Sequence, residues 1–218
     1  MKSFYVFAAG SGILILIGFL ASLMYGKADF LLWLFASRHT IADYYFYYTT
    51  KLGESPGFIF FGFLFLFSSW KKMLPVPILG LVVTISTYLM KIYFEHDRPS
   101  VYLKKLQWEG NLAVLDYHVL GGNNSFPSGH SMAAWALFTL AAALIRKTWF
   151  SIVALILATS VSISRVYLMA HFLQDVVAGA AIGFLLGFGV YYAYARWIKT
   201  HAVTPEGVKY AEDEILDV

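Results

Sequence analysis

The sequence has no cysteine, few charged residues and only a small net charge. The absence of cysteine excludes a disulfide framework, a thiolate metal site and catalysis by a cysteine nucleophile. Only 13% of the 218 residues are charged, whereas about 25% are charged in an ordinary soluble domain. The formal net charge is +3 and the basic residues are scattered, so we expect no nucleic-acid partner.

Apolar and aromatic residues dominate the composition instead. Hydrophobic residues make up 59% of the chain, aromatic residues make up 18%, and the mean hydropathy is +0.65. This composition excludes a disordered chain, a fibrous protein and most soluble enzymes. It predicts a polytopic membrane protein that is surrounded by the lipid bilayer.

Six apolar stretches come close to the length of about 20 residues that a helix needs to cross a bilayer. We expect them at residues 4–25, 57–70 with an extension to 74, 77–94, 130–145, 149–169 and 172–198. The last two run together, and a single helix of about 50 residues would be about 75 Å long. We therefore expect a turn at 171–175. The predicted fold class is all-α, a bundle of six transmembrane helices.

Three other stretches are too polar to cross the membrane. Residues 29–54, between the first two spans, have apolar residues at helical spacing interrupted by charges, which predicts amphipathic helices lying in the interface. Residues 100–126 are polar and include Gly-Gly-Asn-Asn at 121–124, which predicts a loop. We expect a six-span membrane domain over 1–200 and a polar, acidic C-terminal tail over 201–218.

The orientation follows from lysine and arginine near the ends of the spans. The side that holds both termini has basic pairs at 71–72 and 146–147, in very short loops. This side has more lysine and arginine residues than the other side once Lys91, Arg98 and Arg165, which lie on the other side, are left out as functional residues. We therefore expect cytoplasmic termini. The small size and short loops favour a bacterial inner-membrane protein.

The other side collects an unusual set of polar residues. They lie in three segments, 91–99, 126–131 and 164–175, at the outer ends of the third to sixth spans. Alternating spans would bring these distant segments to one face of the membrane, which predicts a single site there.

Three cations in these segments point to an anionic ligand. Lys91 and Arg98 are seven residues apart, so they would share a helix face, and Pro99 would end the span at Arg98. Taken singly, a snorkelling lysine and a helix-end charge explain these two. Arg165 lies within an apolar span, where a charge is costly. Arginine matches the geometry of phosphate oxygens, so the group predicts a phosphate site.

The segment 127–130, Pro-Ser-Gly-His, lies where a loop meets a helix start. Backbone N–H groups at a helix N-terminus bind anions, and Gly129 would let the backbone approach the ligand closely. By itself, an N-cap at Ser128 with a chance histidine at 130 explains the segment equally well.

His171 and Asp175 have the i, i+4 spacing that puts two side chains on one helical turn. A carboxylate on one ring nitrogen fixes the tautomer and leaves the other nitrogen free to act as a nucleophile. A structural hydrogen-bonded pair is the alternative. A metal site is disfavoured, because nearby cations would repel a divalent ion.

Together the three segments resemble the type 2 phosphatidic acid phosphatase superfamily. The family pattern is a Lys followed seven residues later by Arg-Pro, then Pro-Ser-Gly-His, then Ser-Arg, five residues, His, three residues and Asp. All three parts occur here complete, in order and with this spacing, between Lys91 and Asp175. The interfacial stretch after the first span is also similar to the lipid-phosphatase branch of the family.

The resemblance implies a mechanism and a role for each residue. His171 would attack phosphorus and form a phosphohistidine, Asp175 would orient it, and His130 would protonate the leaving oxygen and then activate water. Five further residues would hold the phosphate oxygens: Lys91, Arg98, Ser128, Gly129 and Arg165. No metal or other cofactor is implied, since the cations stabilise the charge.

An outward-facing pocket at the membrane surface suits an amphiphile whose phosphate is polar and whose tail stays among the spans. Undecaprenyl diphosphate, phosphatidylglycerophosphate, phosphatidic acid and lipid A phosphates all fit. Our leading expectation is undecaprenyl diphosphate or a phospholipid phosphate monoester. Nothing in the sequence points to an obligate protein partner.

Three alternatives remain at this point. The first is a structural role, which would leave the polar residues without a purpose, and the other two use the same phosphate pocket. Vanadate-dependent haloperoxidases share the family's fold and pocket, but the known ones are soluble and this composition argues against that activity. A transporter or lipid-binding protein could hold a phosphate group without chemistry. The intact His130, His171 and Asp175 disfavour this, since anion binding needs cations but no nucleophile.

Overall fold

The computed structural model describes residues 2–108, 110, 115 and 120–201, and within them it has helices and no strand. The all-α prediction is confirmed for this part of the chain. The helices are α1 (Lys2–Met24), α2 (Asp29–Ala36), α3 (Thr40–Thr49), the 3₁₀ turn η1 (Thr50–Gly53), α4 (Ser55–Ser68), α5 (Trp70–Met73), α6 (Pro75–Tyr93), α7 (Pro99–Lys105), α8 (Gly129–Ile145), α9 (Thr148–Tyr167) and α10 (Leu173–His201).

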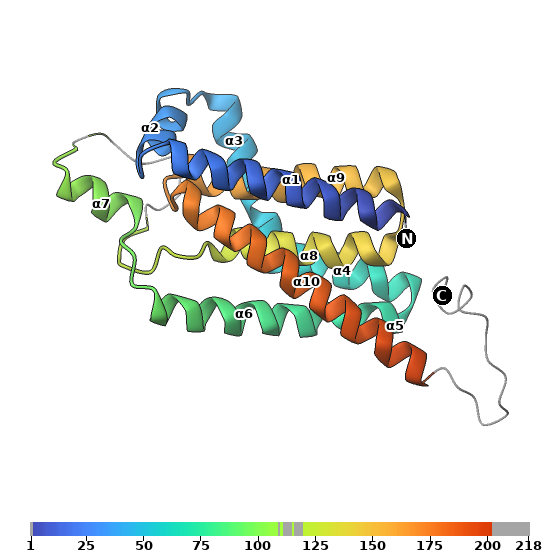
Figure 1. The fold of residues 1–218 in the computed structure, drawn as a ribbon. Helices are drawn as coiled ribbons and strands as arrows, with labels where there is room; N and C mark the ends of the chain where they lie inside the picture. The colour runs from blue at the N-terminus through green and yellow to red at the C-terminus, as the bar shows by residue number, and fades with distance from the viewer. Residues whose placement is uncertain (1, 109, 111–114, 116–119, 202–218) are drawn as a thin grey trace, which may run out of the picture.

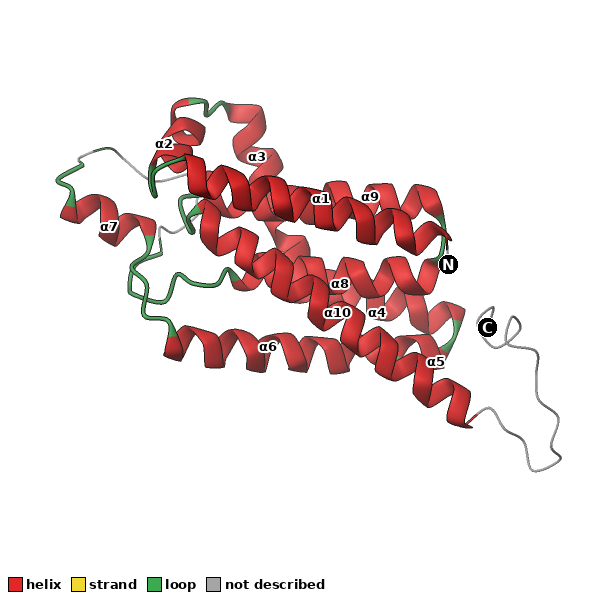
Figure 2. Cartoon of the chain, in the orientation of Figure 1, coloured by secondary structure: helices red, strands yellow, loops and turns green. Residues whose placement is uncertain are grey.

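The longer helices run back and forth between two ends of a bundle (Figure 1). α1, α6 and α9 run toward the end that carries α2 and α7, whereas α4, α8 and α10 run away from it. The longer non-helical connections gather at the α7 end (Figure 2). This is the end at which the three polar segments lie.

Four segments are long and apolar enough to cross a membrane: Lys2–Met24, Trp70–Tyr93, Thr148–Tyr167 and Leu173–His201. They identify an integral membrane protein. α4 and α8 are apolar but shorter, with 14 and 17 residues. The count of six spans stays a prediction for these two helices.

α8 forms the centre of the bundle. Its residues from Ser131 to Ala143 are all buried, and α10 packs directly along it. Glycine makes this approach close: a Cβ at Gly183 or Gly187 would collide with the backbone carbonyl oxygens of Met132 and Ala136. Close backbone packing fixes the start of α8 against the start of α10, and both starts belong to the candidate site.

The second predicted span ends earlier than expected. α4 ends at Ser68, and Ser69 has an extended backbone with φ −168° and ψ 129°. The separate helix α5 follows. The predicted extension to 74 as one helix is therefore wrong.

The third predicted span ends at Tyr93, within one residue of the expected end at 94, so its helix does not continue to Arg98. α6 ends at Tyr93, and Arg98 lies at the N-cap of α7, outside α6. The prediction that Lys91 and Arg98 share one helix face is wrong. Pro99 ends no span and begins α7 instead, because proline is well tolerated at the first position of a helix. The loop prediction is therefore wrong for residues 100–105, which are helical.

The remaining elements are close to expectation. The stretch at 29–54 forms helices α2 and α3 followed by η1, while its place in the membrane interface stays a prediction. The turn expected at 171–175 lies at 168–172. His201 ends α10, and the predicted tail beyond it lies outside the described residues.

Candidate active site

The site lies where the starts of α8 and α10 meet the ends of α6 and α9. The structure brings the three sequence segments together here. His171 is 2% exposed, Asp175 and Arg165 are fully buried, and Arg98 is 6% exposed. Groups of both signs are thus removed from water at one point of a largely apolar bundle.

His171 and Asp175 are adjacent, but they do not share a helical turn as predicted. His171 lies in the turn after α9, and its backbone N–H donates to the carbonyl oxygen of Arg165 at 3.1 Å. Asp175 lies in the first turn of α10, where its Oδ2 accepts from the backbone N–H of Phe172 at 3.0 Å. The turn, and not helix periodicity, sets the position of His171.

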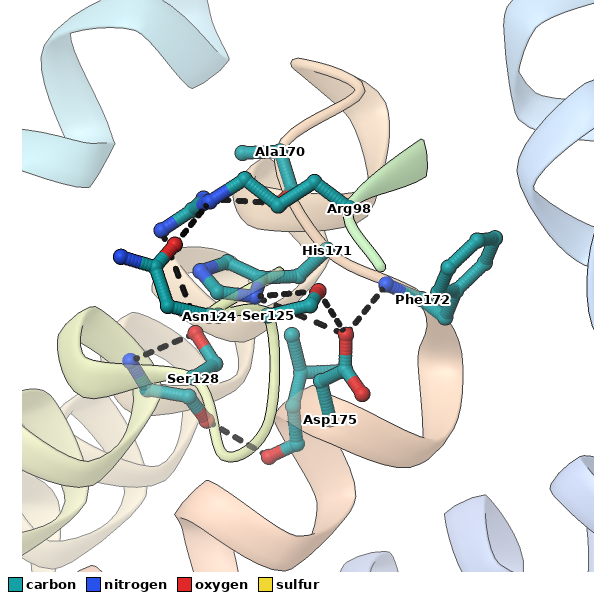
Figure 3. A network of polar contacts seen from close by, with 10 residues as sticks. Arg98, Asn124, Ser125, Ser128, Ala170, His171, Phe172 and Asp175 are labelled. Atoms are coloured by element: carbon teal, nitrogen blue, oxygen red, sulfur yellow. Dashed lines mark hydrogen bonds and ion pairs between the residues drawn. The ribbon is translucent and has the colours of Figure 1, made fainter. Parts of the chain in front are cut away.

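Ser125 links the histidine to the carboxylate (Figure 3). His171 Nδ1 is 3.6 Å from Asp175 Oδ2, which is too long for a good hydrogen bond. The Ser125 hydroxyl donates to Asp175 Oδ2 at 2.6 Å and lies 3.4 Å from His171 Nδ1. Because its hydrogen goes to the carboxylate, Ser125 faces Nδ1 as an acceptor. This assigns the ring hydrogen to Nδ1 and the lone pair to Nε2.

The surroundings of His171 favour the neutral ring. Burial lowers the pKa of His171 to about 3. Asp175 acts in the opposite direction, while the positive charges of Arg165 and Arg98 lower the pKa further. A neutral imidazole with a lone pair on Nε2 is the form that can act as a nucleophile.

Arg98 is fixed from two sides (Figure 3). Its Nε donates to Asn124 Oδ1 at 2.8 Å, and its Nη1 donates to the carbonyl oxygen of Ala170 at 3.2 Å. Its backbone N–H donates to the carbonyl oxygen of Gly122 at 2.9 Å. Arg98 is therefore held by the loop before α8 and not by the helix that the sequence predicted. Its guanidinium lies beside the turn that carries His171.

Arg165 and Lys91 complete the group of cations. Arg165 Nη1 donates to Thr50 Oγ1, in η1, at 2.8 Å. Lys91, in the last turn of α6, interacts electrostatically with Arg98, Arg165 and Asp175. Three positive charges from α6, the loop and α9 thus act on one region, which is the arrangement that an anion requires.

Ser128 is the N-cap of α8, as the sequence allows. Its Oγ accepts from the backbone N–H of Ser131 at 3.5 Å, and its own N–H donates to the carbonyl oxygen of Asp175 at 3.0 Å. These contacts join the starts of α8 and α10. A Cβ at Gly129 would lie 3.0 Å from Thr87 Cγ2 of α6, so the glycine lets α6 approach closely.

His130 has a partner that the sequence did not indicate. Its Nε2 lies 2.9 Å from Oε1 of Glu54, the residue between η1 and α4. Glu54, Thr50, Asn124 and Ser125 are all polar contacts of site residues. They lie outside the predicted motifs, and no spacing rule connects them to the site.

No cluster of three or more His, Cys, Asp or Glu that could hold a metal ion is found in the described part of the chain. The neighbours of the two histidines include Arg98, Arg165 and Lys91. The donor set suits a phosphate or a similar anion better than a cation.

A family model, the PAP2 superfamily, matches residues 75–199. The chain belongs to this superfamily. The matched region holds α6 to α9, α10 up to residue 199, and every predicted site residue. Glu54 and Thr50 lie before it.

Curated relatives in the superfamily are named as phosphatases. A lipid A 4′-phosphatase of Porphyromonas gingivalis is 29% identical over 60% of this chain and 56% of its own length. One from Bacteroides thetaiotaomicron is 35% identical over 57% of this chain and 55% of its own length. Phosphatidylglycerophosphatase B of Bacillus subtilis is 41% identical over 29% of this chain and 36% of its own length. The chain thus spans about half of the length of the first two.

Two crystal structures share the fold. One is the phosphatidylglycerolphosphate phosphatase of Bacillus subtilis, with a TM-score of 0.63 and 24% identity over 88% of this chain and 98% of that one. The other is LpxE of Aquifex aeolicus, with a TM-score of 0.60 and 24% identity over 76% of this chain and 94% of that one. The arrangement of helices is therefore that of PAP2 membrane proteins.

Proposed function

We propose that the protein is a metal-independent lipid phosphatase that works through a phosphohistidine. One observation carries this proposal: the buried His171 has its Nδ1 engaged on the Ser125–Asp175 side and lies beside Arg98 and Arg165. A binding site for phosphate needs the cations alone. A buried, neutral, oriented imidazole adds the group that attacks phosphorus.

In the first step, His171 Nε2 forms a bond to phosphorus and the bond from phosphorus to the leaving oxygen breaks. His130 donates a proton to that oxygen, which leaves as a hydroxyl group or, from a diphosphate, as a lipid phosphate. Asp175, through Ser125, holds the Nδ1 hydrogen and stabilises the positive charge that develops on the ring.

In the second step, water attacks the phosphohistidine. His130 accepts a proton from the water, the bond from Nε2 to phosphorus breaks, and inorganic phosphate is released. Lys91, Arg98 and Arg165 stabilise the charge on the non-bridging oxygens through both steps, with Ser128 and the start of α8 at Gly129 as further donors. No metal ion takes part in this scheme.

The substrate is proposed as a lipid phosphate monoester or diphosphate. Relatives named lipid A 4′-phosphatase and phosphatidylglycerophosphatase B support this class. Lipid A phosphates, phosphatidylglycerophosphate, phosphatidic acid and undecaprenyl diphosphate are the candidates. We also propose six spans, cytoplasmic termini and a site at the outer face of a bacterial inner membrane, with α2 and α3 in the interface.

The test is phosphate release by the purified protein in detergent with EDTA, from a panel of these four lipids. His171→Ala, which removes the nucleophile, is the control and should abolish release. Release that survives EDTA and disappears in the folded variant supports the proposal. If the folded His171→Ala protein released as much phosphate as the wild type, the assignment of His171 as the nucleophile would be wrong.

Labelled substrate separates an enzyme from a protein that only binds phosphate. The wild type should acquire acid-labile phosphate on His171 during turnover. Binding of the lipid with no release and no label would instead favour the transporter or lipid-binding alternative.

A further inference from the structure

Glu54 and His130 form a second histidine–carboxylate pair in the site. Glu54 Oε1 lies 2.9 Å from His130 Nε2, and both side chains are partly accessible, with exposures of 30% and 28%. The other carboxylate oxygen, Oε2, lies 3.3 Å from Nζ of the partly exposed Lys51. The two oxygens therefore have different partners, of which only one belongs to the proposed machinery.

The turn that carries Glu54 is fixed against the site. A Cβ at Gly53 would lie 2.6 Å from the carbonyl oxygen of His130, so only glycine fits where η1 meets the start of α8. Thr50, in the same turn, is fully buried and accepts the hydrogen bond from Arg165. One turn thus contacts both His130 and a phosphate-binding cation, and its backbone sets where the Glu54 carboxylate lies.

Glu54 is the one negatively charged group among the described residues that act on the His130 ring, so it favours the protonated form of the ring. Three charged groups act on the ring: Glu54 before α4, Arg165 on α9 and Lys91 on α6. The two cations oppose a positive charge on the imidazole, whereas the carboxylate stabilises it. The hydrogen bond from His130 lowers the pKa of Glu54 well below its ordinary value despite partial burial, so the carboxylate is ionised at neutral pH.

We propose that Glu54 is a positioning residue for the acid–base histidine. The carboxylate accepts from His130 Nε2–H, which leaves Nδ1 as the nitrogen that exchanges protons with the leaving group and with water. It also stabilises the imidazolium form that donates. Glu54 stays ionised, so the proton leaves Nδ1 in the first step and returns there in the second. This inference rests on the proposed phosphatase activity and adds to the site a residue outside the matched region 75–199.

The kinetic test compares Glu54→Gln with Lys51→Ala. The first keeps the shape of the side chain and removes the carboxylate charge beside His130. The second removes the partly buried ion pair between Lys51 and Glu54 and leaves the contact to His130 intact. For Glu54→Gln we expect kcat to fall by about 10- to 100-fold with little change in KM, since general acid–base catalysis contributes about 100- to 10,000-fold. Lys51→Ala should stay close to the wild type, and Glu54→Asp should recover part of the loss.

The pH profile distinguishes positioning from a structural role. The carboxylate favours the imidazolium, so its removal should move the alkaline limb of kcat to lower pH. In a His130→Ala background, Glu54→Gln should cause little further loss, because the two residues act together. An unshifted limb, or the same fold-loss in both backgrounds, would overturn the proposal.

The tautomer can be measured without activity. In ¹⁵N-histidine-labelled protein, neutral His130 should be protonated at Nε2, with its signals assigned by loss in His130→Gln. Protonation at Nδ1 would overturn the proposal even where Glu54 variants fail to fold. A wild type without phosphatase activity would refute the proposed function, whereas normal activity in Glu54→Gln would refute only the role of Glu54.

Discussion

The site contains two histidine–carboxylate pairs whose surroundings differ. His171 and Asp175 are 2% and 0% exposed, and a serine connects them. His130 and Glu54 are 28% and 30% exposed and are in direct contact at 2.9 Å. The dry pair favours a neutral ring, which is the form that the proposed nucleophile needs, and the wetter pair is accessible to water for the proposed proton exchange. The same two residue types can thus serve as nucleophile and as acid–base according to burial.

Of the substitutions in the two pairs that remove a carboxylate charge, Asp175→Asn should cause the larger loss of activity. Asp175→Asn keeps the shape but removes the charge that stabilises the ring after attack, so we expect kcat to fall by about 100- to 10,000-fold. The measurement is kcat for phosphate release at saturating lipid. The loss should exceed that of Glu54→Gln, because the carboxylate of the buried pair is screened less by water.

The thermal midpoint in detergent controls for folding, since Asp175 Oδ2 also accepts from the backbone N–H of Phe172. A folded Asp175→Asn protein with a smaller loss than Glu54→Gln would reverse the assignment of the two pairs.

The two pairs should also differ in their response to acid. Burial lowers the pKa of His171 to about 3, so its neutral form persists as the pH falls through the ordinary value of 6.5. A histidine with an ordinary pKa would lose about 30-fold in its neutral fraction at pH 5. We therefore expect kcat/KM, corrected for ionisation of the substrate phosphate, to change by much less than this between pH 7 and pH 5. If kcat/KM fell by the full 30-fold, and NMR showed that His171 becomes protonated over the same pH range, burial would not lower the pKa of His171 as we expect.

The sequence predicted the buried pair much better than the second pair. Strict spacing within 91–175 predicted that His171, Asp175 and the cations lie together, and the structure does bring them together, while their roles stay predictions. The geometry was harder to predict. Arg98 is held by Asn124 and Ala170 in place of a helix face, since tertiary contacts override the periodicity that a sequence shows.

Glu54 illustrates why the rest could not be predicted. It is 76 residues from His130 along the chain, and nothing about a lone glutamate before a Ser-Pro helix start connects it to a distant histidine. Only the packing of η1 on α8 brings it to the ring. Helix content and approximate ends follow from apolar runs, whereas contacts between distant segments depend on how those helices pack.

Loss of the Ser125 hydroxyl should reduce activity less than loss of either carboxylate charge. The Ser125 hydroxyl connects His171 to Asp175, since it donates to Asp175 Oδ2 at 2.6 Å and lies 3.4 Å from His171 Nδ1. Removing one hydrogen bond to a charged group costs about 1.5–3 kcal/mol. In Ser125→Ala the ring can move toward the carboxylate and recover part of this, so we expect kcat to fall by about threefold to tenfold. Phosphate release and thermal midpoint are measured together. A loss as large as that of Asp175→Asn would mean that the carboxylate acts on His171 only through the serine, and an unchanged kcat would mean that the carboxylate acts on the ring directly.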